Sequence, residues 1–251
     1  MNTLGVAGCE QLDKIFSNFG LINNNGPSGS QITTLFLGAS ETTGISATFL
    51  SANWAALDLG SPVTRQSTIS FDVQVDPAFV PPPPNDLWSI TSLSLSEVGA
   101  LASIGAGPAN HVQIFEYFCA GSAAFNCTSS SGNYGYIEYE QDGGAPTFGA
   151  PTATDSICFN NGGSSCTVSH GSLTLNLSAF PGSVYPGGVS QIAIEDVVSL
   201  TAPKLLNVAN LNAITNTFVE SAETPEPATF SLLGLAFAGI AVVSCRRRRL
   251  T

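Results

Sequence analysis

Apolar and polar residues alternate with a period of two along much of this 251-residue chain, and this pattern limits the fold more than any other feature. In STISFDVQV (67–75), Ile69, Phe71 and Val73 fall on one face of an extended segment, and Ser70 and Asp72 fall on the other. A strand that buries one face has this pattern. The same alternation predicts further strands at 31–37, 44–50, 89–95, 111–118, 134–140, 172–178 and 191–200.

Clusters of Gly, Pro and Asn separate the predicted strands. The proline run at 81–84 cannot donate ladder hydrogen bonds and is expected to form an exposed connection. Segments 11–19 and 205–214 lack clear alternation, so each could form a short helix or an edge strand. Eight or more strands with turn-rich gaps predict an all-β fold, an antiparallel β-sandwich of jelly-roll type, as one domain over residues 1–219.

The C-terminal end has a different character. Residues 228–245 form an uncharged, largely apolar run of 18 residues, followed by Arg246, Arg247, Arg248 and Arg249. As a helix this run is about 27 Å long, enough to cross the hydrocarbon core of a membrane. The Arg-rich tail at 246–251 is expected to stay on the cytoplasmic side, with the body outside and an acidic, Pro-containing linker at 220–227.

The charge of the body excludes one class of partner. Residues 1–223 contain 17 of the 18 acidic residues but only three basic ones, Lys14, Arg65 and Lys204, which gives a formal charge of −14. A surface of this sign repels phosphate backbones, so no nucleic-acid partner is expected. The arginine run does not change this, because basic residues beside a membrane span are explained by topology and anionic lipid.

Four cysteines form two closely spaced pairs. Cys119 and Cys127 enclose seven residues, and so do Cys158 and Cys166, each stretch being rich in turn-forming residues. We predict two local disulfides, which form in an oxidising compartment outside the cytoplasm. A zinc site would call for CxxC-type pairs or nearby histidines, whereas His111 and His170 are isolated in the sequence.

No catalytic residue is predicted. Glu138 and Glu140 share one face of a predicted strand, and glycosidases use carboxylates about 5–10 Å apart, but a solvent-facing strand also collects glutamates. Tyr134, Tyr136 and Tyr139 are expected on both faces of that strand, without a clear platform for sugar. Trp54 and Trp88 are expected to close the core.

No cofactor and no metal site are predicted either, although calcium stays open as an alternative. Turns around 142–144, 155 and 160–163 offer carboxylate and amide oxygens, without the spacing of an EF-hand loop. Asn, Asp and Gly also favour such turns when no metal is present.

The C-terminal end resembles the PEP-CTERM sorting signal of bacteria. The matching elements are the tripeptide Pro225, Glu226 and Pro227, the apolar segment with Gly234 and Gly239, and the arginine cluster. The resemblance implies an exosortase-type processing enzyme as partner. It also implies a stay in the inner membrane before processing, and then a place at the cell surface or in the extracellular matrix.

The N-terminal stretch is similar to the start of the mature region in a subset of these proteins. Asp13, Lys14, Phe16, Ser17, Asn18 and Phe19 carry the similarity. The first 20 residues have no signal-peptide pattern, so we expect that a signal peptide is missing from this sequence.

Together these observations predict an exported bacterial surface or matrix protein without catalytic activity, with extracellular polysaccharide as a candidate partner. Two alternatives stay open: a glycan- or calcium-binding adhesive module, and a secreted glycoside hydrolase.

Overall fold

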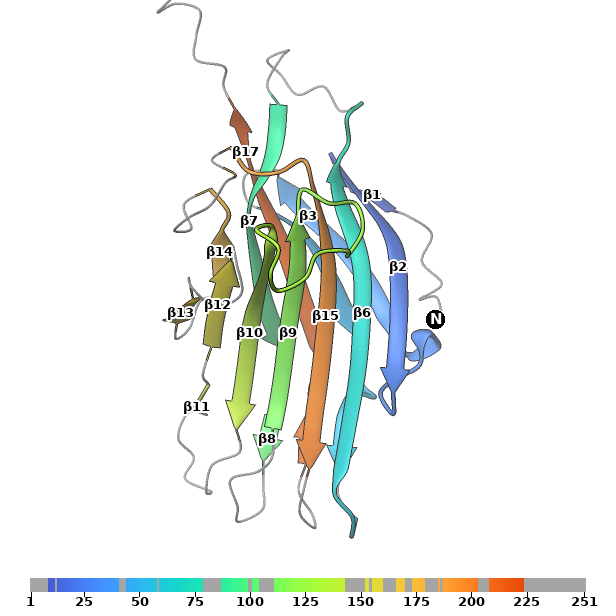
Figure 1. Cartoon of the computed structure of the whole chain (residues 1–251). Coiled ribbons are helices and arrows are strands. Elements are labelled where there is room, and N and C mark those ends of the chain that lie inside the picture. The colour runs from blue at the N-terminus through green and yellow to red at the C-terminus, as the bar shows by residue number, and fades with distance from the viewer. Residues whose placement is uncertain are drawn as a thin grey trace, which may run out of the picture.

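The computed structural model describes most of the body, which is built almost entirely from β-strands (Figure 1). The described residues are 9–11, 13–40, 44–57, 59–78, 87–98, 101–103, 111–142, 152–153, 155–159, 166–169, 173–178, 185, 187–202 and 208–223. Within them lie seventeen strands and one 3-10 helix, η1 (Gly29–Gln31).

The larger sheet contains nine of these strands, all paired antiparallel. Its order is β1 (Cys9–Gln11), β2 (Lys14–Asn24), β6 (Val63–Val75), β15 (Gln191–Ala202), β9 (His111–Ala120), β10 (Tyr134–Asp142), β12 (Asp155–Phe159) and β13 (Cys166–Ser169), with β11 (Thr152–Ala153) also paired to β10. Inward-facing residues of β15 such as Ile194 and Val198 are buried, whereas Glu195, Val197 and Ser199 are partly exposed. This sheet therefore has one core face and one outer face.

The second sheet contains five strands, again antiparallel. Its order is β14 (Thr174–Asn176), β7 (Leu87–Val98), β17 (Ala213–Glu223), β4 (Gly44–Leu50) and β3 (Thr33–Ser40). A small third sheet has the order β5 (Ala55–Leu57), β16 (Val208–Asn210) and β8 (Leu101–Ser103).

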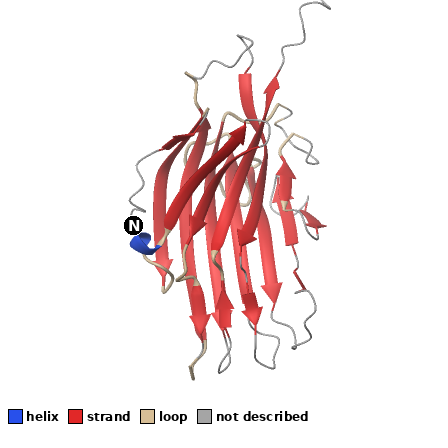
Figure 2. Ribbon diagram, turned by 180° about the vertical axis from the view of Figure 1, so that it is seen from behind, coloured by secondary structure: helices blue, strands red, loops and turns tan. Residues whose placement is uncertain are grey.

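Aromatic side chains join the inner faces of the two main sheets, which form separate layers (Figures 1 and 2). Phe16 of β2 and Phe71 of β6 lie 6.1 and 6.3 Å, between ring centroids, from Phe218 of β17. Phe49 of β4 lies 5.4 Å from Phe71. All four rings are buried, and each contributes roughly 1.5–3 kcal/mol through the apolar area that it removes from water.

A β-bulge explains the irregular sequence of β2. Its pairing with β6 shifts between Ser17 and Gly20, where Asn18 adopts a positive φ of 56°, a conformation that Asn tolerates better than most residues. The bulge lets both Phe16 and Phe19 face the core. Their spacing of three residues resembles a helical pattern, although the segment is a strand.

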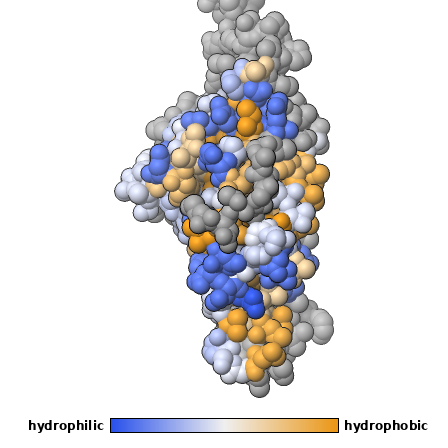
Figure 3. Space-filling view, turned by 90° about the vertical axis from the view of Figure 1, so that its right-hand side faces the viewer, coloured by the Kyte–Doolittle hydropathy of each residue, from blue (hydrophilic) through white to orange (hydrophobic). Residues whose placement is uncertain are grey.

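Exposed apolar side chains are scattered over the described surface. The large ones are Ile22, Leu35, Leu37, Leu57 and Leu59. The side of the molecule shown in Figure 3 mixes hydrophilic and hydrophobic patches, and no single apolar surface covers it. Single exposed apolar residues of this kind are normal for a folded domain.

The prediction of an all-β fold with antiparallel sheets is confirmed, and each of the eight segments predicted to be a strand contains one. The last strand, β17, continues to Glu223, and Glu220 is buried, so the strand runs past residue 219, where the body was predicted to end and the linker (220–227) to begin. The predicted membrane span at 228–245 lies outside the described residues. Within the described part of the chain, no helix is long and apolar enough to span a bilayer.

Candidate functional site

Four aromatic side chains gather on the outer face of the larger sheet, on the neighbouring strands β9 and β10. Val112, Ile114, Glu116 and Phe118 of β9 are buried, so Phe115 and Tyr117 between them point outward. In β10, Tyr136 lies directly opposite Tyr117, and Tyr134 lies opposite Cys119. The register therefore brings Phe115, Tyr117, Tyr134 and Tyr136 together, and we call them the aromatic patch.

The rings of the aromatic patch touch one another. Phe115 and Tyr117 are nearly parallel, with 5.3 Å between centroids, and Tyr117 and Tyr134 lie 6.0 Å apart at 26°. These separations are too short for parallel rings side by side in one plane, so the rings overlap in an offset stack. Tyr136 meets Phe115 edge-on, at 5.9 Å and 69°. All four side chains are half-buried.

Carboxylates surround the aromatic patch. Glu138 lies opposite Phe115, and its Oε1 accepts a 2.8 Å hydrogen bond from Nε2 of Gln113. Glu195 of β15 lies opposite Tyr117 on the other side of β9. Burial, and then the negative charges of Glu138 and Glu195, raise the pKa of Tyr117. Burial together with neighbouring tyrosines and Glu195 raises the pKa of Tyr134 to about 12, so both hydroxyls keep their protons at neutral pH.

A disulfide-bonded loop borders one end of the aromatic patch. Cys119 and Cys127 form the first predicted disulfide, with their Cα atoms 5.8 Å apart. Backbone hydrogen bonds from Gly121 to Gln191 and from Ala120 to Asn133 hold the two ends of the loop against the sheet. Cys119 is fully buried even though its position in β9 faces outward, because the loop folds over it.

The second predicted disulfide is not decided. Cys158 of β12 and Cys166 of β13 are directly opposite each other in an antiparallel pair. Their side chains lie outside the described part of the structure, so the bond itself stays a prediction.

The structure places Glu138 and Glu140 together on the outer face of β10, as predicted. Oε1 of Glu140 lies 3.5 Å from Nδ1 of His111. Tyr139 faces the core and Tyr134 and Tyr136 face outward, so the expected division between two faces is confirmed. The sequence interpretation missed that Phe115 and Tyr117 join Tyr134 and Tyr136. The signal was the alternation in HVQIFEYF (111–118), but only the register between β9 and β10 reveals the patch.

The remaining predicted candidates divide between the core and the part of the chain outside the described residues. Trp54 is buried in the core, as expected, and the side chain of Trp88 is outside the described part. His170 and most of the proposed calcium-binding turns at 143–144 and 160–163 are also outside it. Among the residues that the structure describes, no group of three or more His, Cys, Asp or Glu side chains could hold a metal ion.

Two buried carboxyl groups face each other inside the core. Glu116 of β9 and Asp196 of β15 are directly opposite in the register, and both are fully buried. Nδ2 of Asn216, from β17 in the other sheet, donates a 2.5 Å hydrogen bond to Oδ2 of Asp196. Burial raises the pKa of Asp196 to about 7, and burial together with the charge of Asp196 raises the pKa of Glu116 well above its usual value. A shared proton is therefore favoured over two adjacent charges.

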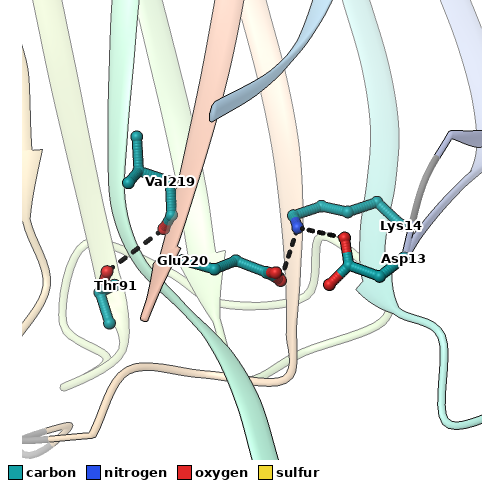
Figure 4. Close-up of polar contacts among 5 residues, drawn as sticks. All are labelled: Asp13, Lys14, Thr91, Val219 and Glu220. Carbon is teal, nitrogen blue, oxygen red and sulfur yellow. Dashed lines mark hydrogen bonds and ion pairs between the residues drawn. The ribbon is translucent and has the colours of Figure 1, made fainter. Parts of the chain in front are cut away.

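A second cluster of buried polar side chains links β2, the first long strand, to β17, the last strand (Figure 4). Nζ of Lys14 lies 3.1 Å from Oδ1 of Asp13 and 2.5 Å from Oε1 of Glu220, and all three side chains are buried. One lysine can neutralise only one carboxylate. Burial and the hydrogen bond that protonated Glu220 donates to Asp13 raise the pKa of Glu220 to about 8 despite the nearby lysine, so the trio is neutral when Glu220 keeps its proton.

Comparison with known protein families bears on the C-terminal end. Residues 223–249 match the family model described as the PEP-CTERM protein-sorting motif, which confirms the resemblance seen in the sequence. The match begins at Glu223, the last residue of β17. A search of curated proteins gave no match to the chain. The chain is thus a β-protein that carries a bacterial sorting motif.

Proposed function

We propose that this chain is an exported bacterial protein of the cell surface or extracellular matrix, with no catalytic activity of its own. The observation that carries the proposal is the PEP-CTERM match at residues 223–249. Residues 228–245 cross the inner membrane as a helix, with Arg246 to Arg249 in the cytoplasm. An exosortase-type enzyme then processes the chain near Pro225, Glu226 and Pro227, and the body is released to the surface or matrix.

The body in this proposal is a β-sandwich of jelly-roll type. The strand order supports it: β6-β15-β9-β10 in one sheet and β4-β17-β7-β14 in the other. If these eight strands alone are numbered in chain order from 1 to 8, the first sheet has the order 2-7-4-5 and the second sheet has the order 1-8-3-6. Two interleaved Greek keys produce this order. β2 and β3 extend the two sheets at their edges.

The sorting proposal predicts that the arginine run and the tripeptide act differently. Replacing Arg246 to Arg249 by Ser removes the charges that retain the C-terminus in the cytoplasm, so the protein is expected to be misoriented or mislocalised. Replacing the same four residues by Lys preserves the charge and is the matched control. Replacing Pro225, Glu226 and Pro227 by Ala should leave orientation unchanged and block processing.

The experiment needs a bacterium that has an exosortase. Protease shaving of intact cells reports exposure of the body, and mass spectrometry of the recovered chain reports processing. A Ser variant that is exposed and processed like the unaltered protein would contradict the proposed topology. A processed tripeptide variant would contradict the exosortase step.

A glycan-binding adhesive role is the second candidate, and the aromatic patch favours it. The hydrolase alternative has weaker support, because Glu138 is hydrogen-bonded by Gln113 and Glu140 lies beside His111. Reducing-sugar release from neutral polysaccharides by the purified chain, lost in Glu138→Gln, would favour the hydrolase over the non-catalytic role.

A further inference from the structure

We propose that the aromatic patch on β9 and β10 is a binding site for a neutral, extended polysaccharide, of the kind formed by β-linked hexopyranose units. The inference deepens the proposed function by naming the ligand class and its site, and it rests on that function for the polysaccharide to be met outside the cell. It does not depend on how the chain is sorted.

The composition of the aromatic patch is the first argument. The core is filled from the other face of the sheet, where Ile114 and Phe118 are buried, so the core does not require Phe115 and Tyr117 on the outer face. An outer strand face that only meets water needs no aromatic rings, and the neighbouring outward positions of β15 carry Glu195, Val197 and Ser199. Four contacting rings at one place on such a face are typical of a recognition surface.

The shape of the aromatic patch selects an extended chain. It follows the strands from the pair Phe115–Glu138, through Tyr117–Tyr136, to Cys119–Tyr134. These three levels span about 13 Å, because two residues of a strand rise by roughly 6.6 Å. Within this length the overlapping rings are 5.3 and 6.0 Å apart between centroids, so they form one continuous row. The disulfide-bonded loop between β9 and β10 bounds one end of the aromatic patch. A bound polysaccharide would therefore extend beyond the other end, toward Gln113 and Glu140.

The chemistry of the aromatic patch selects a neutral sugar. The C–H groups on one face of a hexopyranose can pack on the outward side of the overlapping rings, where apolar area is then removed from water. Sugar hydroxyls can donate hydrogen bonds to the carboxylates of Glu138 and Glu195, which border the rings. Those carboxylates repel uronic acids and sulfated sugars. Of the described residues only Lys14 and Arg65 are Lys or Arg, and neither lies on β9 or β10.

The anchoring of the aromatic patch favours binding without large rearrangement. Gln113 holds Glu138, the rings support each other, and the Cys119–Cys127 disulfide fixes the loop beside Tyr134. A surface whose side chains are already ordered loses little conformational entropy when it binds.

The test uses the full chain, purified in a polyoxyethylene detergent because maltoside and glucoside detergents carry a competing sugar. The probes are cellohexaose and laminarin, which are neutral and β-linked, and alginate, which is anionic. We expect calorimetry to show binding to at least one neutral probe and none to alginate. Phe115→Thr with Tyr117→Thr should raise the Kd by about tenfold or more, the loss expected for a central contact.

Two further variants are matched controls for binding, and urea unfolding of the double Thr variant checks that it is folded. Tyr136→Phe keeps the ring and removes one hydroxyl, so it should retain most of the affinity. Leu35→Thr alters an exposed side chain on the other sheet and should leave binding unchanged. The proposal is overturned if neither neutral probe binds, if the double Thr variant binds as well as the unaltered chain, or if alginate binds best. Any of these results leaves the sorting proposal intact, because localisation in cells is measured separately.

Discussion

At the scale of single residues, the buried pair Glu116 and Asp196 makes stability depend on pH. Both carboxyls ionise near pH 4 in the unfolded chain. Burial raises the pKa of Asp196 to about 7 in the folded protein, so the folded state binds more protons between these values. The free energy of unfolding is therefore expected to fall as the pH rises from about 4 to 7, with a loss of roughly 4 kcal/mol from Asp196, and Glu220, whose pKa is about 8, extends the fall above pH 7.

Urea unfolding of the full chain at pH 5 and pH 8, followed by tryptophan fluorescence, measures this difference. Glu116→Gln removes one of the two acidic groups and should reduce the dependence on pH. Glu10→Gln, at an exposed position of β1, is the matched control and should not. Equal stability at the two pH values would contradict the shared proton.

The same residues show where sequence patterns stop being informative. In HVQIFEYF, Ile114 and Phe118 predict a buried face, but Glu116 lies on that face and the aromatic residues Phe115 and Tyr117 lie on the other. The alternation predicts the strand, but it does not show which of its two faces is buried. Burial of Glu116 depends on Asp196, which is eighty residues away in the sequence and is brought opposite by the register of β9 and β15.

At the scale of elements, the disulfide-bonded loop between β9 and β10 joins the core to the aromatic patch. Replacing Cys119 and Cys127 by Ser removes a cross-link that limits the unfolded chain, and should lower the free energy of unfolding by about 2–3 kcal/mol. Since Cys119 lies opposite Tyr134, the aromatic patch should also lose order at that end.

Urea unfolding measures the first effect, and near-ultraviolet circular dichroism of the tyrosines measures the second. Serine in place of Cys9 is the control for loss of a thiol. Unchanged tyrosine dichroism in the double variant would mean that the loop does not order the aromatic patch.

Elements also differ in how well the sequence predicts them. β6 and β15 alternate along most of their length, and the predicted segments 67–75 and 191–200 lie within them. Part of β2 was predicted only as either a short helix or an edge strand over 11–19, because its bulge at Asn18 changes which residues face inward. Most of β17 was missed because the buried positions of AITNTFVESAE include Asn216 and Glu220, whose polarity is matched only by partners on other strands.

At the scale of the whole molecule, Lys14 and Glu220 join the start of the body to its end. β17 stops at Glu223, two residues before Pro225, so the last strand leads almost directly into the sorting motif. The residues of the N-terminal similarity have structural roles: Asp13 and Lys14 contact each other beside Glu220, Phe16 and Phe19 fill the core, and Asn18 donates a hydrogen bond to Asp72.

The buried trio should therefore control folding of the whole body. Lys14→Met leaves Asp13 and Glu220 in the core without a cation, and should cost about 3–5 kcal/mol. Lys14→Met with Asp13→Asn removes both charges of the ion pair and leaves Glu220 protonated below its pKa of about 8, so it should recover much of this loss. Gln74→Met, at an exposed position of β6, controls for the new side chain. Urea unfolding at pH 6 compares the four proteins. A double variant no more stable than Lys14→Met would mean that packing of the lysine stem, rather than charge balance, holds β2 to β17.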